Sequence, residues 1–310
     1  MRNETPFHEP SATSWWFDEA LAAEAAQFGP EGYAPSTLRG DVDVDVVIVG
    51  GGFTGLWSAL LLAREAPQLS IALIEAGKCG SGASGKNGGK SHGYWAQLPT
   101  LMANLGADAA LAMASAGTRA QDAIRAFSKE ARLDFWWREA GNIRVSTTPA
   151  QDVKLQKYLS DAAACGATHA VRGLSREELN AYCASSAFRG GIFFTEGATV
   201  QPARLARALR IAAIEAGVKI YEDTAMLSFD AGSPCVVVTS KGKITARQII
   251  LATNVALGKQ RMIARWLSVF SSYAAMSEPT DVLDRLNWTG HQGYADSRMF
   301  LHYFRRTDEG

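Results

Sequence analysis

The sequence VDVVIVGGGFTGLWSALLLAREAPQLSIALIE, residues 44–75, decides the fold. Val44–Val49 is almost entirely apolar, as is typical of a strand that a parallel sheet buries on both faces. Gly50–Gly55 follows with the spacing G-x-G-x-x-G. A helical pattern then runs to about Glu65, and a second short apolar strand ends at Glu75. This order of strand, glycine turn, helix and strand predicts a Rossmann-like α/β unit.

The glycine turn predicts a site for a dinucleotide. Gly50 permits the tight turn, Gly52 lets a pyrophosphate approach the backbone, and Gly55 lets helix and strand pack closely. The start of the helix presents free N–H groups and a partial positive charge to the phosphates. Glu75 stands twenty residues after Gly55, where an acid binds the ribose hydroxyls of adenosine and disfavours NADP. The contacts predicted here are Gly50, Gly52, Phe53, Thr54, Gly55, Glu75 and Ala76.

A second glycine-rich loop distinguishes between FAD and NAD. Seven of the seventeen residues in Gly77–Gly93 are glycine, and the loop follows Glu75 directly. It therefore passes the same end of the sheet and permits close backbone contact with a large ligand. We favour FAD, and an NAD-binding dehydrogenase is the alternative.

Composition and charge exclude several other classes of protein. With 31 acidic and 31 basic side chains among 310 residues, the chain offers no field for nucleic acid. The four cysteines are scattered, which favours reduced, buried thiols over a metal site. Residues 1–12 have no apolar core of a secretory signal, and the run Leu56–Ala63 is far shorter than the roughly 20 residues of a membrane span. We expect a cytoplasmic protein with no transmembrane segment.

Segments spread over nearly the whole chain carry a family resemblance. They are Ser14-Trp15-Trp16, Gly50–Gly55, Glu75, Gly82–Gly89, the helix after Pro202, Gln248–Asn254 and Tyr294–Arg305. Together they resemble the D-amino-acid-oxidase-like FAD-dependent oxidoreductases, and among these the γ-glutamylputrescine oxidoreductase group. The most specific of these segments is Ala-Ser-Gly-Lys-Asn-Gly-Gly at 83–89.

The resemblance implies further cofactor contacts. Ser84 and Asn87–Gly89 (Asn87, Gly88 and Gly89) would lie along the flavin and pyrophosphate. The backbone around Ala225 would face the adenine, and Ala252 and Thr253 would lie near the pyrophosphate. Some relatives attach the flavin covalently through a histidine of the loop. Lys86 takes that position here, which predicts non-covalent FAD.

The expected fold class is α/β, with a discontinuous α+β second domain built on an antiparallel sheet. The predicted parts are an N-terminal arm (1–43), an FAD-binding domain (44–98 and 199–256) and a substrate domain (99–198 and 257–310). Residues 99–140 show a helical, alanine-rich pattern with expected breaks at Gly106 and Gly117. Family members continue beyond the point equivalent to Gly310, so we expect a C-terminally truncated fragment. An inactive, truncated flavin-fold nucleotide-binding protein is therefore a second alternative.

The implied reaction is oxidation of the C–N bond of an amine or amino acid. Hydride passes to the flavin, water hydrolyses the imine, and O2 or another carrier reoxidises the cofactor. A dedicated base is not required if the amine binds neutral, so we predict no catalytic side chain and no metal.

Substrate contacts are expected from the second domain. A strand predicted over Tyr294–Phe304 places Arg298 on one face and Tyr303 on the other. Arg298 would clamp a carboxylate, with a solvated surface charge as the alternative. His92 is the third substrate candidate, with a packed role as the alternative. Trp136-Trp137 is expected to pack within a helix, with a substrate wall as the alternative.

Overall fold

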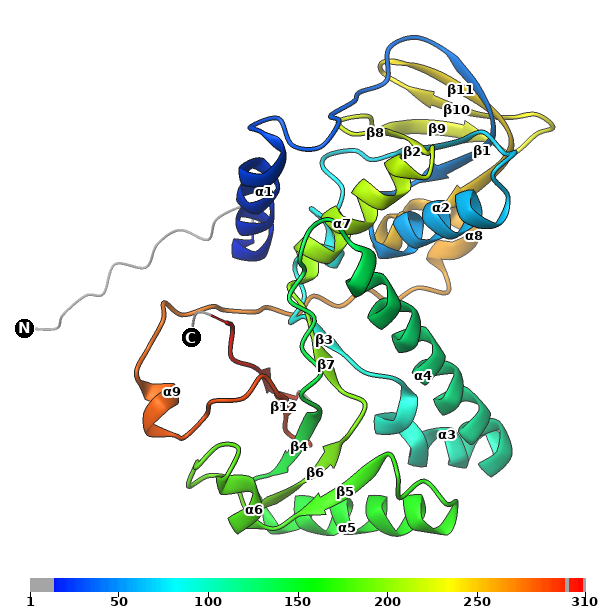
Figure 1. The fold of residues 1–310 in the computed structure, drawn as a ribbon. Coiled ribbons are helices and arrows are strands. Elements are labelled where there is room, and N and C mark those ends of the chain that lie inside the picture. The colour runs from blue at the N-terminus through cyan, green and yellow to red at the C-terminus, as the bar shows by residue number, and fades with distance from the viewer. Residues whose placement is uncertain (1–13, 299–300, 309–310) are drawn as a thin grey trace, which may run out of the picture. The chain divides into compact units, whose positions relative to one another are not determined.

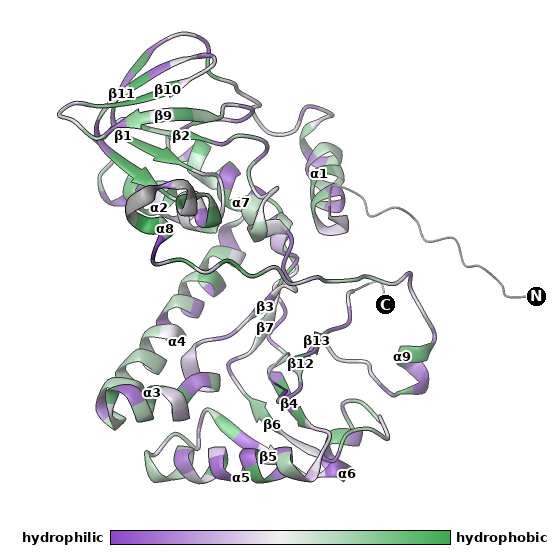
Figure 2. Ribbon diagram, turned by 180° about the vertical axis from the view of Figure 1, so that it is seen from behind, coloured by the Kyte–Doolittle hydropathy of each residue, from purple (hydrophilic) through white to green (hydrophobic). Residues whose placement is uncertain are grey.

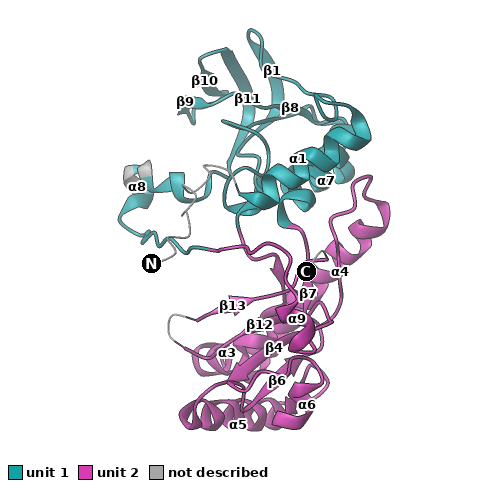
Figure 3. Cartoon of the chain, turned by 90° about the vertical axis from the view of Figure 1, so that its left-hand side faces the viewer, with its two compact units in different colours: residues 1–86, 202–273 teal, residues 87–201, 274–310 magenta. Residues whose placement is uncertain are grey.

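A computed structural model describes residues 14–298 and 301–308 of the chain. It divides into two compact units (Figure 3). Unit 1 comprises residues 1–86 and 202–273, and unit 2 comprises residues 87–201 and 274–310. The first break follows Lys86, whereas the sequence led us to expect it after residue 98. The assignment of one unit to FAD and the other to the substrate stays a prediction.

Unit 1 is built on a six-stranded sheet with the order β8-β2-β1-β11-β10-β9 (Figure 1). The pairs β8–β2, β2–β1 and β1–β11 are parallel, and β11–β10 and β10–β9 are antiparallel. Strand β1 lies near the centre of the sheet, is apolar along most of its length in Figure 2 and is buried on both faces, as its sequence predicts. The strands are β1 (Val42–Val49), β2 (Ile71–Ile74), β8 (Lys219–Tyr221), β9 (Met226–Asp230), β10 (Cys235–Thr239) and β11 (Gly242–Leu251).

Helices complete unit 1. Helix α2 follows the glycine turn and packs on α7, which also contacts α1. Ser14 caps α1, because its hydroxyl accepts a hydrogen bond from the Phe17 N–H. The predicted arm is therefore part of the unit from residue 14 onward, and residues 1–13 lie outside the described chain. The helices are α1 (Trp15–Phe28), α2 (Phe53–Glu65), α7 (Pro202–Glu215) and α8 (Arg261–Ala264), with short 3₁₀ turns η1 (Ala83–Gly85) and η3 (Asn254–Lys259).

A buried ion cluster ties α1 to α7 inside unit 1. Glu24 lies on α1, Arg207 and Arg210 on α7, and Glu222 just after β8; all four side chains are almost inaccessible to solvent. Arg207 Nε lies 2.5 Å from Glu24 Oε2, and its Nη1 lies 2.6 Å from Glu222 Oε1. Arg210 Nη2 lies 3.1 Å from Glu222 Oε2. Each carboxylate thus faces two guanidiniums.

Unit 2 contains a five-stranded sheet with the order β13-β12-β4-β6-β5 and a two-stranded ribbon β3–β7. All pairs are antiparallel except β12–β4. The strands are β3 (Lys90–Ser91), β4 (Asn142–Ser146), β5 (Val171–Leu174), β6 (Gly190–Phe194), β7 (Ala198–Thr199), β12 (Gly293–Ala295) and β13 (Tyr303–Phe304). The helices are α3 (Leu98–Leu105), α4 (Ala107–Glu130), α5 (Pro149–Ala164), α6 (Arg176–Asn180) and α9 (Val282–Arg285), with the 3₁₀ turn η2 (Tyr94–Gln97).

The helical prediction for residues 99–140 was right at Gly106 and wrong at Gly117. Helix α4 runs through Gly117 without a break. The residue is glycine because a Cβ at this position would lie 2.8 Å from the Tyr94 nitrogen. This glycine serves close packing of α4 on η2 and does not end a helix. The helix ends at Glu130, so Trp136 and Trp137 lie in irregular chain and the prediction of helix packing for them was wrong.

The strand predicted over residues 294–304 is two short strands. Strands β12 and β13 pair in antiparallel fashion, with Tyr294 opposite Phe304. Between them the carboxylate of Asp296 accepts hydrogen bonds from the N–H groups of Arg298 and His302, which turns the chain instead of extending it. The predicted alternation of Arg298 and Tyr303 along one strand was therefore wrong. Residues 309–310 lie outside the described chain.

Candidate functional site

The glycine turn in unit 1 brings the ends of β1, α2 and β11 together. Gly50 has φ +115°, and a Cβ on it would lie 2.5 Å from the Ala252 carbonyl oxygen. A Cβ on Gly55 would overlap the Gly50 carbonyl oxygen. Only glycine permits this close approach of strand and helix at either position. The turn thus has the backbone geometry that its spacing predicts.

Helix α2 follows directly on the glycine turn, so the backbone amide groups of its first turn lie beside it. Its N-cap is Gly52, which offers no side chain to the first turn. The hydroxyl of Ser84 accepts a hydrogen bond of 2.9 Å from the Phe53 N–H, so the second glycine loop reaches the start of α2. A Cβ on Gly52 would meet this same Ser84 hydroxyl at 2.9 Å. The arrangement leaves backbone and hydroxyl groups, and no bulky side chain, where a phosphate would bind.

Glu75 is held firmly at the end of β2. Its Oε2 accepts a hydrogen bond of 2.7 Å from the Gly51 N–H, and its Oε1 accepts one of 3.0 Å from Gly77. The Thr224 N–H donates to the Glu75 carbonyl at 2.8 Å, which brings the segment leading to Ala225 beside the acid. Each carboxylate oxygen keeps acceptor capacity for a ribose hydroxyl. The residues at this end of the sheet therefore fit the pyrophosphate and adenosine half of FAD.

Unit 1 collects most of the predicted cofactor residues. Beside the turn the Ala252 N–H continues the β1 ladder by donating to the Val49 carbonyl, and Thr253 follows it. Thr54, Ala76, Lys86 and Ala225 are exposed. The predicted residues in this unit are Gly50, Gly52, Phe53, Thr54, Gly55, Glu75, Ala76, Ser84, Lys86, Ala225, Ala252 and Thr253.

The remaining part of the glycine loop, from Asn87 onward, belongs to unit 2. The Asn87 side-chain oxygen accepts a hydrogen bond of 2.8 Å from the Gly89 N–H. Arg305 Nε donates to the Gly88 carbonyl at 2.7 Å, and its Nη2 donates to the Val200 carbonyl at 2.6 Å. Burial lowers the pKa of Arg305 to about 10. Arg305 thus fixes the loop, a role that the sequence did not indicate.

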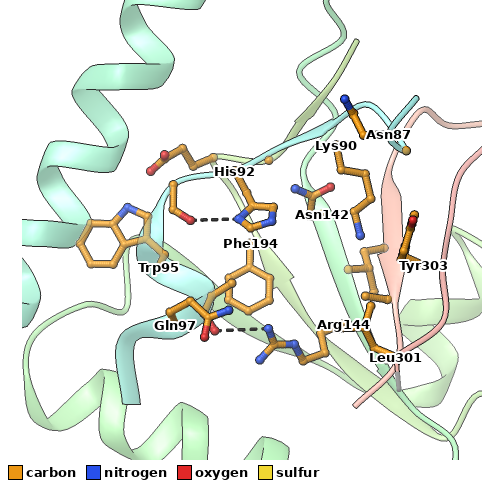
Figure 4. Close-up of a pocket in the computed structure, with 17 residues that line it drawn as sticks. Asn87, Lys90, His92, Trp95, Gln97, Asn142, Arg144, Phe194, Leu301 and Tyr303 are labelled. Carbon is orange, nitrogen blue, oxygen red and sulfur yellow. Dashed lines mark hydrogen bonds between the residues drawn. The ribbon is translucent and has the colours of Figure 1, made fainter. Parts of the chain in front are cut away.

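A cavity of about 310 Å³ lies within unit 2 (Figure 4). It is lined by the loop from Asn87 to Gln97, by β4 and the end of β6, and by Leu301 and Tyr303. Its volume lies at the small end of the range for ligand sites. The ring of Phe194 and the side chains of Leu301 and Tyr303 give it apolar walls.

Two cations line this cavity. Lys90 Nζ donates a hydrogen bond of 2.8 Å to the Tyr294 carbonyl. Arg144 Nη2 donates one of 3.2 Å to the Ala96 carbonyl, and its guanidinium lies 5.5 Å from the centre of the Phe194 ring. Burial, together with the charge of Arg144, lowers the pKa of Lys90 to about 8. Burial also lowers the pKa of Arg144.

Residues 45–310 match the family model described as FAD dependent oxidoreductase. The chain belongs to this family. It is 31% identical over 228 residues to the gamma-glutamylputrescine oxidoreductase of Escherichia coli (strain K12), an alignment that covers 73% of this chain. This chain spans 53% of that relative's length.

Solved structures with the same fold include two oxidoreductases. Glycine oxidase from Geobacillus kaustophilus superposes with a TM-score of 0.59 at 21% identity, covering 86% of this chain and 73% of that one. L-Amino acid deaminase from Proteus myxofaciens gives a TM-score of 0.59 at 22% identity, covering 76% and 51%. The predicted α/β class with a Rossmann-like domain is confirmed. The family match also decides between FAD and NAD in favour of FAD.

The structure agrees only partly with the positions that we predicted for the substrate-contacting residues. His92 and Tyr303 line the cavity, and their contact with a substrate stays a prediction. The described residues that line it do not include Arg298, whose guanidinium is half exposed and lies 3.2 Å from Asp296 Oδ2. The solvated-charge alternative fits Arg298 better than the clamp.

The sequence analysis missed Lys90 and Arg144. Lys90 lies in the glycine loop, whose composition we explained by close contact with a cofactor. Arg144 lies in a strand where the alternation of polar and apolar residues suggests a solvated face. Arg144 lies between the buried Ile143 and Val145. Because the strand Asn142–Ser146 alternates polar and apolar residues, its sequence offered no signal that Arg144 lines a cavity.

The cysteines are reduced and mostly buried, as the sequence predicts. Cys79, Cys183 and Cys235 are buried, Cys165 is partly buried, and all four are free thiols. No helix among residues 14–298 and 301–308 is long and apolar enough to cross a membrane.

Proposed function

We propose that this chain binds FAD non-covalently in unit 1 and takes part in oxidising the C–N bond of an amine or amino acid. The observation that carries the proposal is the coincidence, at one end of the unit 1 sheet, of an α2 N-terminus whose N-cap residue has no side chain, the Gly50 turn and the anchored Glu75 carboxylate. The names of two similar proteins, an amine oxidoreductase and a glycine oxidase, support the substrate class.

Different residues of unit 1 would bind the pyrophosphate, the ribose and the adenine of FAD. The first N–H groups of α2 and the Ser84 hydroxyl would bind the pyrophosphate, and Glu75 would accept hydrogen bonds from the ribose hydroxyls. The backbone near Ala225 would face the adenine. Lys86, the last residue of this part of the loop, cannot form the histidyl bond that some relatives make, so the cofactor should dissociate.

The residues of unit 2 would hold the substrate. When bound, FAD would supply the acceptor for a hydride from the carbon next to the nitrogen; the nitrogen would lose a proton, and water would convert the resulting imine to a carbonyl compound and ammonia or an amine. The chain's own part is to orient that carbon and to exclude water, which the apolar walls of Phe194, Leu301 and Tyr303 suit. A γ-glutamylputrescine-like amine is the most specific substrate we propose. O2 or a separate carrier would reoxidise the cofactor.

The test begins with the purified full chain. We expect a yellow protein that releases free FAD in acid and is bleached by an amine or amino acid without oxygen. Folded, colourless protein that does not take up added FAD would contradict the proposal. Glu75→Gln should weaken FAD binding about tenfold, since it removes charge-assisted hydrogen bonds. Glu65→Gln, an exposed change at the end of α2, is the matched control and should leave the affinity unchanged.

A further inference from the structure

Lys90 presents to the unit 2 cavity an amine that the proposed reaction does not use. It lies in β3, and its side chain lines the cavity beside Asn142 (Figure 4). Its aliphatic part packs over Gly293, where a Cβ would lie 2.7 Å from the Lys90 Cε and 3.0 Å from its Cδ. Its Nζ donates a hydrogen bond of 2.8 Å to the Tyr294 carbonyl oxygen. The amine is therefore held at a fixed point of the cavity wall.

The surroundings of Lys90 favour the unprotonated amine. Lys90 forms no ion pair with a carboxylate in the part of the chain that the structure describes. Glu196 also lines the cavity, but its Oε2 accepts a hydrogen bond of 2.6 Å from the Thr118 hydroxyl instead. Burial, together with the charge of Arg144, lowers the pKa of Lys90 to about 8. A desolvated lysine of this kind is a nucleophile toward carbonyl groups at slightly alkaline pH.

An acceptor oxygen without a partner lies beside this amine. Asn142 is 5% exposed, and its Nδ2 donates a hydrogen bond of 3.1 Å to the Ser91 carbonyl. Its Oδ1 is enclosed and accepts no hydrogen bond from the described residues. A Cβ on Gly293 would lie 2.4 Å from this Oδ1 and 2.7 Å from the Lys90 Cε, so the two side chains meet at this glycine. Because buried oxygens normally accept a hydrogen bond, a hydroxyl group formed at Lys90 fits here.

We propose that Lys90, assisted by Asn142, captures small apolar aldehydes in the unit 2 cavity as an imine. The Nζ lone pair attacks the carbonyl carbon, and the hydroxyl of the resulting carbinolamine donates a hydrogen bond to Asn142 Oδ1. The carbon–oxygen bond then breaks and a carbon–nitrogen double bond forms. The oxygen leaves as water with the two protons of the amine, so the step consumes no oxidant or reductant. Water reverses it and frees the aldehyde.

The walls of the cavity suit such an aldehyde. The side chains of Phe194, Leu301 and Tyr303 offer apolar contacts, and the volume of about 310 Å³ favours a small molecule. The inference goes beyond the proposed function, because capture needs neither FAD nor an amine substrate. Oxidation of a primary amine would nevertheless release an aldehyde, and its capture by Lys90 would retain the product.

The test traps the imine on the full chain. Butanal and sodium cyanoborohydride are added at pH 8, the reductant converts an imine to a stable butyl-lysine, and peptide mass spectrometry gives the labelling rate of each lysine. Lys86, an exposed lysine of the same glycine loop, is the internal control. We expect Lys90 to be labelled at least about tenfold faster than Lys86, since an ordinary lysine, with a pKa of about 10.4, is almost entirely protonated at this pH. In concentrated urea, which unfolds the chain, the two rates should be equal.

Asn142→Leu tests the assisting oxygen, because leucine keeps the approximate shape of the side chain and removes the acceptor. We expect this variant to label Lys90 about tenfold more slowly and Lys86 at an unchanged rate. Gln97→Leu is the matched control, since it removes an amide that also lines the cavity, away from Lys90 in Figure 4. It should change neither rate. A thermal melt shows whether each variant is folded, and the comparison of the two lysines in the wild type needs no variant.

Each outcome decides one claim. Equal labelling of Lys90 and Lys86 in the folded chain overturns the inference, and it leaves the proposed function intact if the chain binds FAD and oxidises an amine. A preference for Lys90 that persists in urea also overturns it, because the cavity is then not the cause. Selective labelling of Lys90 in a folded chain that neither binds FAD nor oxidises any amine supports the inference and overturns the proposed function. Equal effects of Asn142→Leu and Gln97→Leu overturn the part assigned to Asn142.

Discussion

Replacing Glu24 by glutamine should destabilise unit 1 severely. The side chain of Glu24 is 1% exposed and faces both guanidiniums of the α1–α7 ion cluster. Its Oε1 lies 3.0 Å from Arg207 Nη2 and 3.7 Å from Arg210 Nη1, and it accepts a hydrogen bond of 3.0 Å from the Tyr33 N–H. Glutamine keeps the shape but removes the charge. It leaves two buried cations with a single carboxylate, that of Glu222.

The magnitude follows from the burial of the cluster. Removing one partner of a buried ion pair typically costs about 3–5 kcal/mol, since the remaining charge stays buried. Total stabilities of domains are only about 5–15 kcal/mol. We therefore expect the melting temperature of unit 1 to fall by roughly 6–20 °C, at about 2–4 °C per kcal/mol. Urea unfolding followed by circular dichroism would measure the change.

A matched control lies on the same two helices. Glu19 of α1 pairs with Arg204 of α7, but their side chains are 18% and 15% exposed. Glu19→Gln should cost about 1 kcal/mol or less, because solvent replaces much of what the pair loses. If Glu24→Gln and Glu19→Gln lowered the free energy of unfolding equally, the reasoning from burial would be refuted.

Three other perturbations have definite expected outcomes. Gly55→Ala should destabilise unit 1 by about 1–3 kcal/mol and abolish tight FAD binding, because the added methyl group overlaps the Gly50 carbonyl oxygen. Gly82→Ala, which has open space around its Cβ, should change neither the melting temperature nor the affinity in FAD titrations. Glu222 contributes stability above its ordinary pKa of 4.5 that is lost as pH falls through its folded value. Burial raises the pKa of Glu222 in the folded chain, but the charges of Arg207 and Arg210 outweigh burial and hold this pKa below its ordinary value. The free energy of unfolding should therefore fall more steeply with decreasing pH for the wild type than for Glu222→Gln. Affinity for a small carboxylate such as acetate should fall as pH rises above about 8, since Lys90, which lines the cavity, loses its charge there. His92, Arg144, Glu196 and Tyr303 also face the cavity, so the assignment depends on Lys90→Met giving a flat profile between pH 7 and 9.5.

The dinucleotide fold could be predicted because its signals are local. The strand before Gly50, the three glycines and the acid at 75 lie within one stretch, and each residue type answers a constraint of its own few neighbours. Gly55 is an example, since the atom that forbids a side chain there belongs to Gly50, five residues away. The capping box that starts α6 is another local feature, in which the Ser175 hydroxyl accepts from the Glu178 N–H and the Glu178 carboxylate accepts from the Ser175 N–H.

The errors arose where a contact that the sequence pattern does not reveal decides the path of the chain. Gly117 has the composition of a helix break, yet the backbone of Gly93 and Tyr94 needs a residue without a side chain at that point of α4. Asp296 has the spacing of a strand residue, but its carboxylate binds two nearby N–H groups and bends the chain. Lys90 and Arg144 come together only because β3 and β4 enter the same cavity, which no local pattern encodes.

The two sets of buried charge show how structure and binding can be told apart. In unit 1, Arg207 and Arg210 meet Glu24 and Glu222, so positive and negative charges balance within the protein and nothing remains for a ligand. In the unit 2 cavity, Lys90 and Arg144 have backbone carbonyls but no ion pair among the described residues. A balanced cluster stabilises the fold at any ligand concentration. An unbalanced one costs stability until a group of opposite charge approaches, so we assign only the first to architecture.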